Sequence, residues 1–161
     1  MHGVAHLDLV LDGSILVLEL HSPADNMLGF EYLPSSNTDI ATTRAAMDTL
    51  RQANSVTSLP SAAGCTLDEV TLESPIFAAV EATHQHDHDH DHDHKHGDKA
   101  RAHNDISAQY QFTCSNPEAL STLDVSLFEH FPRTETLILQ AITPSGQQGG
   151  ELSAGNNRIR F

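Results

Sequence analysis

Basic side chains are scarce in this chain of 161 residues, where eight Lys and Arg stand against 22 Asp and Glu and the formal net charge is −14. A surface this acidic repels the phosphates of nucleic acids and the headgroups of anionic lipids. We therefore expect neither of these as a partner. Cations, and divalent metal ions among them, are the natural ligands of such a chain.

Long apolar runs are also lacking. No segment approaches the roughly 18 apolar residues that a membrane-spanning helix needs, so we expect no membrane span. The length and the 39% of hydrophobic residues predict a single domain over residues 1–161 with one core. Met1 is followed directly by strand-like sequence instead of a basic and apolar leader, which is compatible with a mature form whose signal peptide has been removed.

Cysteine is limited to Cys65 and Cys114, and neither belongs to a CxxC pair of the kind that holds structural zinc. A disulfide between them is favoured over two separate buried thiols, and it implies an oxidising compartment. Such a bridge would close the segment that carries most of the histidines and limit how far its ends can separate.

Recognisable catalytic motifs are lacking too. The sequence has no Gly-rich phosphate loop, no HExxH helix and no GxSxG elbow, and TPSGQQGG at residues 143–150 looks like a turn. Carboxylates such as Asp8 and Glu31 have no identifiable partner for acid and base roles. We therefore expect no enzymatic activity.

The most distinctive feature present is HQHDHDHDHDHKHGD at residues 84–98, with a histidine at every second position from His84 to His96. It lies in mid-chain between segments that look foldable, which is unlike a purification tag. Residues 84–105 have almost no apolar side chain, so this loop is expected to be disordered without metal. A charged, solvated linker without a ligand is the alternative, but the strict spacing favours metal binding.

The spacing also predicts the kind of binding. In an extended chain, residues two apart point to one side at roughly 6.6 to 7 Å. A bent loop can then gather two or three imidazoles and a carboxylate around Zn²⁺. We expect several exchangeable zinc sites, at which Cu²⁺ or Ni²⁺ would also bind in vitro. The predicted metal ligands are His84, His86, His88, His90, His92, His94, His96 and His103.

Near the N-terminus, HLDLVLDGSILVLELHS at residues 6–22 reads as two alternating strands around an Asp12-Gly13 turn. Pairing of Leu11 with Ser14 would place His6 opposite Glu19, Asp8 opposite Val17, and Val4 opposite His21. The core face of this hairpin carries Leu7, Leu9, Leu11, Leu16, Leu18 and Leu20. The opposite face carries His2, His6, Asp8, Glu19 and His21.

Cross-strand neighbours on this polar face are close enough to share an ion. Candidate ligands of a second metal site are therefore His2, His6, Glu19 and His21. The alternative is that these are ordinary exposed residues on an outer sheet face without a ligand.

The remaining sequence completes the predicted fold. Spacing of Ile40, Met47 and Leu50 predicts one amphipathic helix over about 38–54. Residues 65–82 are read as one or two strands interrupted at Pro75, and 120–131 as an apolar segment or strand without helix, with His130 at a strand end. The fold class is α+β, an antiparallel β-sheet scaffold with one main helix, whose N-terminal half (1–83) and β-rich C-terminal half (106–161) flank the long loop.

Several segments together resemble a known family. HGVAHLDLVLDG, HSPADNMLGFEYLP, Gly64-Cys65, the His/Asp tract, YQFTC and LFEHFP are similar to the ZrgA-type zinc-regulated periplasmic proteins of Gram-negative bacteria, over essentially the whole chain. The most specific parts are residues 22–31 and the two cysteines that flank the tract.

The resemblance implies a periplasmic protein, made when zinc is scarce, that binds several zinc ions and assists an ABC-type zinc uptake system. Metal ligands carry over only to the histidines of the tract. Two rival functions stay open: a buffer or detoxification protein for zinc, copper or nickel, and a protein-interaction module in which the loop is a metal-set switch.

Overall fold

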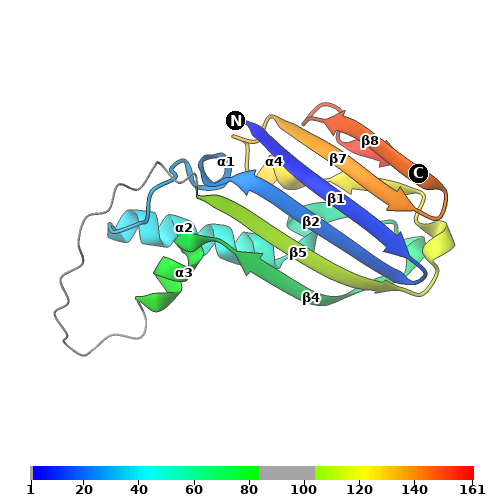
Figure 1. Ribbon diagram of the computed structural model, residues 1–161, viewed down its shortest axis with the longest axis horizontal. Coiled ribbons are helices and arrows are strands. Elements are labelled where there is room, and N and C mark those ends of the chain that lie inside the picture. Colours follow the sequence, from blue (N-terminus) through cyan, green and yellow to red (C-terminus); the bar gives the residue numbers. More distant parts are fainter. Residues whose placement is uncertain (1, 84–103) are drawn as a thin grey trace.

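The computed structural model describes residues 2–83 and 104–161, which form two packed layers (Figure 1). The first layer is a six-stranded sheet in the order β4 (Cys65–Glu73), β5 (Asp105–Cys114), β2 (Ile15–Pro23), β1 (Val4–Asp12), β7 (Thr136–Thr143) and β8 (Gly146–Leu152). The second layer combines helix α2 (Asn37–Arg51) with a small sheet of β3 (Thr57–Ser58), β6 (Thr122–Val125) and β9 (Arg158–Arg160).

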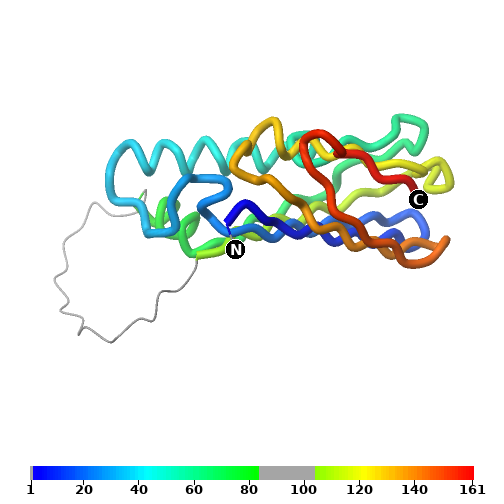
Figure 2. The backbone as a smooth tube through the Cα atoms, turned by 90° about the horizontal axis from the view of Figure 1, so that it is seen from above, coloured from blue at the N-terminus to red at the C-terminus, as the bar shows by residue number. Residues whose placement is uncertain are grey.

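Short helices lie in the connections between these elements. They are α1 (Ala24–Leu28), α3 (Pro75–Ala82) and α4 (Leu127–His130), with single 3-10 turns at Ala53–Ser55, Ser61–Ala63 and Pro117–Ala119. Figure 2 shows the large sheet edge-on, with α2 and the small sheet on one side of it. The opposite face of the large sheet, called the outer face below, is not covered by any helix or strand within residues 2–83 and 104–161.

The predicted α+β class with a mainly antiparallel sheet is confirmed. One pairing departs from it, because β1 and β7 run parallel while β1–β2, β2–β5, β4–β5 and β7–β8 are antiparallel. The N-terminal hairpin lies in the middle of the sheet, between β5 and β7. The two halves of the sequence therefore share one sheet and one core.

The hairpin itself is confirmed, but its predicted register is wrong by two residues. Asp12 pairs with Ile15, so the turn consists of Gly13 and Ser14. Gly13 has φ of +58°, and Ser14 does not adopt a positive φ. A glycine at the first turn position followed by a residue of ordinary φ is the pattern of a type II′ turn, which competes with the Asp-Gly turn in this sequence.

This shift by two residues keeps every side chain on its predicted face and changes its cross-strand partner. His6 pairs with His21 and Asp8 pairs with Glu19, in place of the predicted pairs of His6 with Glu19 and Asp8 with Val17. The six leucines of the core face are at most 7% exposed. Full burial of one leucine is worth about 1.5 to 3 kcal/mol, so this face holds the hairpin against the second layer.

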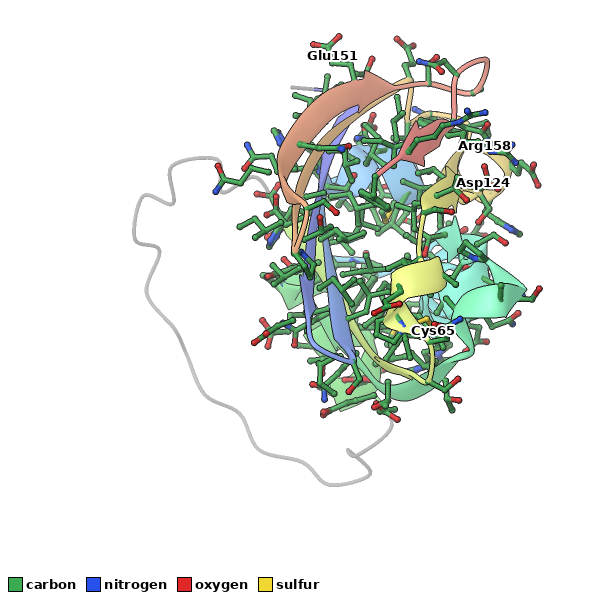
Figure 3. All side chains as sticks on the ribbon, turned by 90° about the vertical axis from the view of Figure 1, so that its right-hand side faces the viewer. Cys65, Asp124, Glu151 and Arg158 are labelled. Atoms are coloured by element: carbon green, nitrogen blue, oxygen red, sulfur yellow. A yellow bond between two sulfur atoms is a disulfide. The ribbon has the colours of Figure 1, made fainter. Side chains whose placement is uncertain are left out.

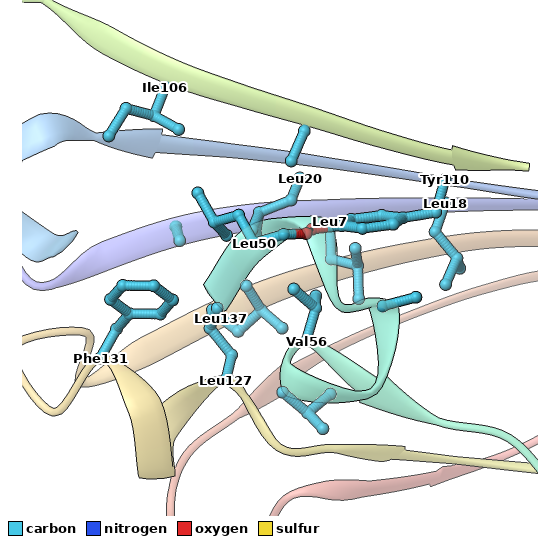
Figure 4. Close-up of a cluster of buried hydrophobic side chains, with 14 of the residues drawn as sticks. Leu7, Leu18, Leu20, Leu50, Val56, Ile106, Tyr110, Leu127, Phe131 and Leu137 are labelled. Carbon is cyan, nitrogen blue, oxygen red and sulfur yellow. The ribbon is translucent and has the colours of Figure 1, made fainter. Parts of the chain in front are cut away.

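Helix α2 covers the middle of that core. It begins after Ser36, whose Oγ accepts a hydrogen bond from the Asp39 amide at 3.1 Å. It ends at Arg51, a few residues earlier than predicted. Leu50 near its end is fully buried among the sheet leucines and beside Tyr110 of β5 (Figure 4).

Two segments predicted as strands contain helices. After Pro75 the chain forms α3, because Ser74 caps it by accepting a hydrogen bond from the Ile76 amide at 3.2 Å and Pro75 suits the first helical turn. Between β6 and β7, α4 ends at His130, which is therefore a helix-end side chain. The turn predicted over residues 143–150 is wrong for most of that segment, because strand β8 already begins at Gly146.

Viewed along the long axis, the two layers separate clearly (Figure 3).

In the small sheet, the Arg158 guanidinium donates hydrogen bonds to both oxygens of the Asp124 carboxylate, across the β6–β9 pair. These hydrogen bonds lower the pKa of Asp124 from its usual range. In the described part of the chain, every helix is too short or too polar to cross a bilayer.

Candidate metal-binding site

The predicted tract ligands, His84 to His96 at alternate positions and His103, lie outside the described residues. The structure does describe the two points from which the tract departs. Helix α3 ends at Ala82, and strand β5 begins at Asp105, close to the predicted end of the loop.

The N-terminal departure point is held by α3. Ile76, Phe77 and Val80 on this helix are at most 2% exposed. Near the helix end, the Glu81 carboxylate lies 3.6 Å from the Arg51 guanidinium of α2. The pair is exposed and contributes little stability, so the buried apolar face is the main anchor.

The C-terminal departure point is held by hydrogen bonds of Asn104. The carbonyl of Asn104 accepts from the Ala24 amide at 3.1 Å, and its side-chain amide donates to the Glu31 carbonyl at 2.7 Å. Directly after it, Asp105 pairs with Pro23 of β2. Both ends of the tract therefore join ordered elements at the same end of the large sheet (Figure 1).

The predicted disulfide is confirmed, and it joins Cys65 to Cys114 at the paired ends of β4 and β5 (Figure 3). These are the strand ends remote from the tract. Near the tract, Glu73 of β4 pairs with Ser107 of β5, about eight residues or roughly 26 Å along the strand from the bridge. Strand pairing, more directly than the disulfide, therefore fixes the ends of β4 and β5 that are nearest to the tract.

The predicted hairpin ligands lie on the outer face. One transverse row of this face crosses all six strands through Glu73, Ser107, His21, His6, Ile138 and Glu151. In the next row, Glu19 of β2 pairs with Asp8 of β1. Two histidines and two carboxylates thus form a block on the two central strands.

His21 has a defined setting within this block. Its Nε2 lies 3.1 Å from Glu19 Oε1, and its Nδ1 lies 2.9 Å from Ser107 Oγ. His6 is exposed and makes no hydrogen bond or ion pair within residues 2–83 and 104–161. The ring of His21 is therefore oriented from two sides, whereas that of His6 is free to rotate.

His2 has separate partners. Its Nε2 lies 3.3 Å from Glu31 Oε1, and its Nδ1 lies 3.8 Å from Asp25 Oδ2. The Arg133 guanidinium also approaches the same Asp25 oxygen, at 3.7 Å. The structure therefore divides the predicted second set into His6, Glu19 and His21 on the strands and His2 beside α1.

Part of the outer face is hollowed. A cavity of about 760 Å³ lies at the end of the sheet nearest the tract, and its lining includes both strand histidines, His6 and His21. Carboxylates that line it come from three separate segments: Glu31 from the connection between α1 and α2, Asp105 from β5 and Glu151 from β8. As the side chains stand, no three His, Cys, Asp or Glu residues in the described ranges are arranged to hold a metal ion.

Sequence reasoning placed His6, His21 and Glu19 on one face because alternation along a strand is visible in the sequence. It missed Ser107 and Glu151, which reach the same row from β5 and β8. No local signal reports the pairings of β2 with β5 and of β1 with β7 that bring them there, since each joins segments more than 80 residues apart.

Comparison with known proteins adds the family. A search among curated proteins finds no match. The model of the family described as ZrgA family zinc uptake protein matches residues 1–161, the whole chain. This confirms the resemblance seen in the sequence segments, and the chain belongs to the ZrgA family of zinc uptake proteins.

Proposed function

We propose that this chain is a periplasmic zinc-binding accessory protein that captures zinc with its His/Asp tract and assists high-affinity zinc uptake. The observation that carries the proposal is the run of seven histidines at alternate positions, in a chain of a zinc uptake family. The proposed ligands are the histidines from His84 to His96, with His103 beyond them.

The chemistry of the tract suits capture and release. Neighbouring imidazoles compete for the same ion, so zinc can pass between overlapping sets of ligands without complete dissociation. The intervening aspartates offset the charge of the ion and can orient an imidazole or bind the metal themselves. A tract of this kind raises the local zinc concentration next to a protein partner. The partners that we propose are components of an ABC uptake system.

Two structural features support this assignment. The tract leaves the fold between α3 and β5, whose ends are each fixed by burial or hydrogen bonding, so the scaffold can present it at one end of the molecule. The disulfide between Cys65 and Cys114 fits an oxidising compartment such as the periplasm. We propose no catalytic role for this protein.

The proposal is tested by zinc titration calorimetry, with bound metal counted by elemental analysis. The intact protein is compared with two full-length variants, one with residues 84–103 replaced by a Gly/Ser linker and one with the eight tract histidines replaced by asparagine. The second variant keeps the length and the aspartates, so it isolates the imidazoles. We expect both variants to lose most of the bound zinc, and retention of the full stoichiometry would overturn the proposal.

The delivery role needs a separate test, because a buffer would bind zinc equally well. Expression that rises under zinc shortage supports delivery, and expression that rises under excess zinc, copper or nickel supports buffering or detoxification. A set of protein partners that is unchanged by chelator and by loss of the tract would instead favour an interaction module.

A further inference from the structure

A second group of metal-binding side chains lies on the outer face of the large sheet, on strands and apart from the tract. Its histidines are His6 of β1 and His21 of β2, which are directly opposite each other in an antiparallel pair. Residues in such pairs have Cβ atoms about 4.5 to 5.5 Å apart. Two imidazoles at this separation can reach one ion from rigid backbone.

The contact between His21 and Glu19 already has the separation of two ligands of one ion. Two donors at 2.0 to 2.1 Å from a tetrahedral zinc ion are about 3.3 Å apart. The observed separation of His21 Nε2 and Glu19 Oε1 is 3.1 Å. When Nδ1 of this ring donates its proton to Ser107 Oγ, Nε2 presents a lone pair toward the carboxylate, and a divalent cation can bind between the two acceptors.

Ser107 therefore acts as a positioning residue for this ring. A metal-binding histidine typically uses its second ring nitrogen to donate to a neighbouring oxygen, which fixes the tautomer and the ring plane. The Ser107 hydroxyl, 2.9 Å from Nδ1, is placed to accept that proton. This leaves His6 as the one ligand that must turn toward the ion, and within the described residues it has no hydrogen bond or ion pair that the turn would break.

Charge and space at this position also favour a cation. Asp8 pairs with Glu19 in the adjoining row, and three further carboxylates line the cavity beside the two histidines. Among the described residues that line this cavity, none is Lys or Arg. This cavity of about 760 Å³ is lined by both histidines, though not by Glu19, and on their side it leaves room for water molecules that complete the coordination of the ion.

We propose that His6, His21 and Glu19 form a second divalent-cation site on the outer face of the sheet, with a preference for borderline metals such as Zn²⁺. The side chains as they stand are an unassembled form of this site, and rotation of the His6 ring completes it. The site is separate from the tract, and its existence does not depend on the proposed function.

The test measures zinc affinity and stoichiometry in the full-length protein whose eight tract histidines are replaced by asparagine. Zinc alone is the probe, measured by competition with a chromophoric chelator. We expect about one equivalent of zinc to bind in this background. Addition of H6N and H21N should weaken that binding at least tenfold, whereas H130N, a matched change of an exposed histidine on α4, should leave it unchanged.

A background that binds no zinc, or a zinc affinity that is the same with and without H6N and H21N, overturns the site. Either result leaves the tract proposal intact, because that proposal is judged by what the asparagine substitutions remove. Circular dichroism and the melting temperature without metal check that all variants fold. His6 is exposed and His21 is partly exposed, so folding is expected to survive both substitutions.

The unmodified protein provides a second readout. The ring carbon and proton resonances of His6 and His21 are followed during zinc titration, with His130 as the internal reference. We expect both strand histidines to shift together and to saturate, with His130 unaffected. Shifts of His6 and His21 that match that of His130 would contradict the proposal.

Discussion

The hydroxyl of Tyr110 donates a hydrogen bond to the backbone carbonyl of Leu50, and so connects the middle of β5 to the last turn of α2. Both residues are fully buried (Figure 4). The carbonyl of Leu50 belongs to the last four of the helix, which have no partner within it. The tyrosine therefore satisfies a helix end inside the core.

Replacement of Tyr110 by phenylalanine should destabilise the protein by about 1 to 3 kcal/mol, because it leaves this buried carbonyl without a donor. The free energy of unfolding is measured by denaturant titration. Tyr32→Phe is the matched control, since the Tyr32 hydroxyl donates to Asp39 at an exposed position. An equal loss of unfolding free energy in both variants would show that the buried hydrogen bond stabilises the protein no more than the exposed one.

Alkaline pH should destabilise the protein through the same residue. Burial raises the pKa of the Tyr110 phenol above its ordinary value. Between about pH 10, where the unfolded phenol ionises, and the higher native pKa, the unfolded state has lost a proton that the native state keeps, so stability falls as pH rises.

Tyrosinate absorbance and circular dichroism, followed together, test this prediction. Tyr32 should ionise while the protein is folded, although its hydrogen bond to Asp39 raises its pKa. Tyr110 should ionise only as the circular dichroism signal is lost. Ionisation of both tyrosines before unfolding would contradict the prediction, and the Tyr110→Phe variant identifies the later step.

Removal of the disulfide should lower stability without changing zinc stoichiometry. The bridge spans a sequence separation of 49, for which the chain-entropy relation gives about 4 kcal/mol. It lies at the far end of β4 and β5, while Glu73 pairs with Ser107 near the tract. Denaturant unfolding and zinc titration of Cys65→Ala/Cys114→Ala measure both effects. Parallel loss of bound zinc in a folded double variant would show that the bridge is needed to present the tract.

Features fixed by local alternation were predictable from the sequence. The leucines of the hairpin repeat every two residues, and the same alternation placed His6, Glu19 and His21 on the opposite face. Helix α2 was visible because its apolar residues recur at helical spacing and Asp39 and Arg51 occupy its ends. The disulfide followed from the presence of only two cysteines, with the pairing left to test.

Features that depend on competing turns or on distant partners were not predictable. Asp12-Gly13 and Gly13-Ser14 are both acceptable turns, and the choice decides whether His6 pairs with Glu19 or with His21. Strand β8 has a Gly- and Gln-rich sequence without alternating apolar residues, so its composition does not predict a strand. It is a strand because it pairs with β7. The apolar run of α3 is so short that the spacing of its apolar residues does not distinguish a helix from a strand.

Replacement of Ser107 by alanine should weaken zinc binding at the site proposed on the outer face. The change tests whether the His21 imidazole is held in position by Ser107 or is simply exposed. The change removes the acceptor of the His21 Nδ1 proton and leaves the ring plane free, while the alternation of buried residues along β5 is untouched. Loss of such a partner typically costs 10- to 100-fold in metal affinity, and we expect about tenfold at this partly exposed position.

Zinc affinity is measured in the protein whose tract histidines are replaced by asparagine, together with the ring resonances of His21. Ser107→Thr keeps the hydroxyl and should restore most of the affinity. Gln111→Ala, an outward-facing change on the same strand opposite Val17, is the control for altered strand surface. If Ser107→Ala binds zinc as tightly as the background protein, the Ser107 hydroxyl has no part in positioning the His21 ring.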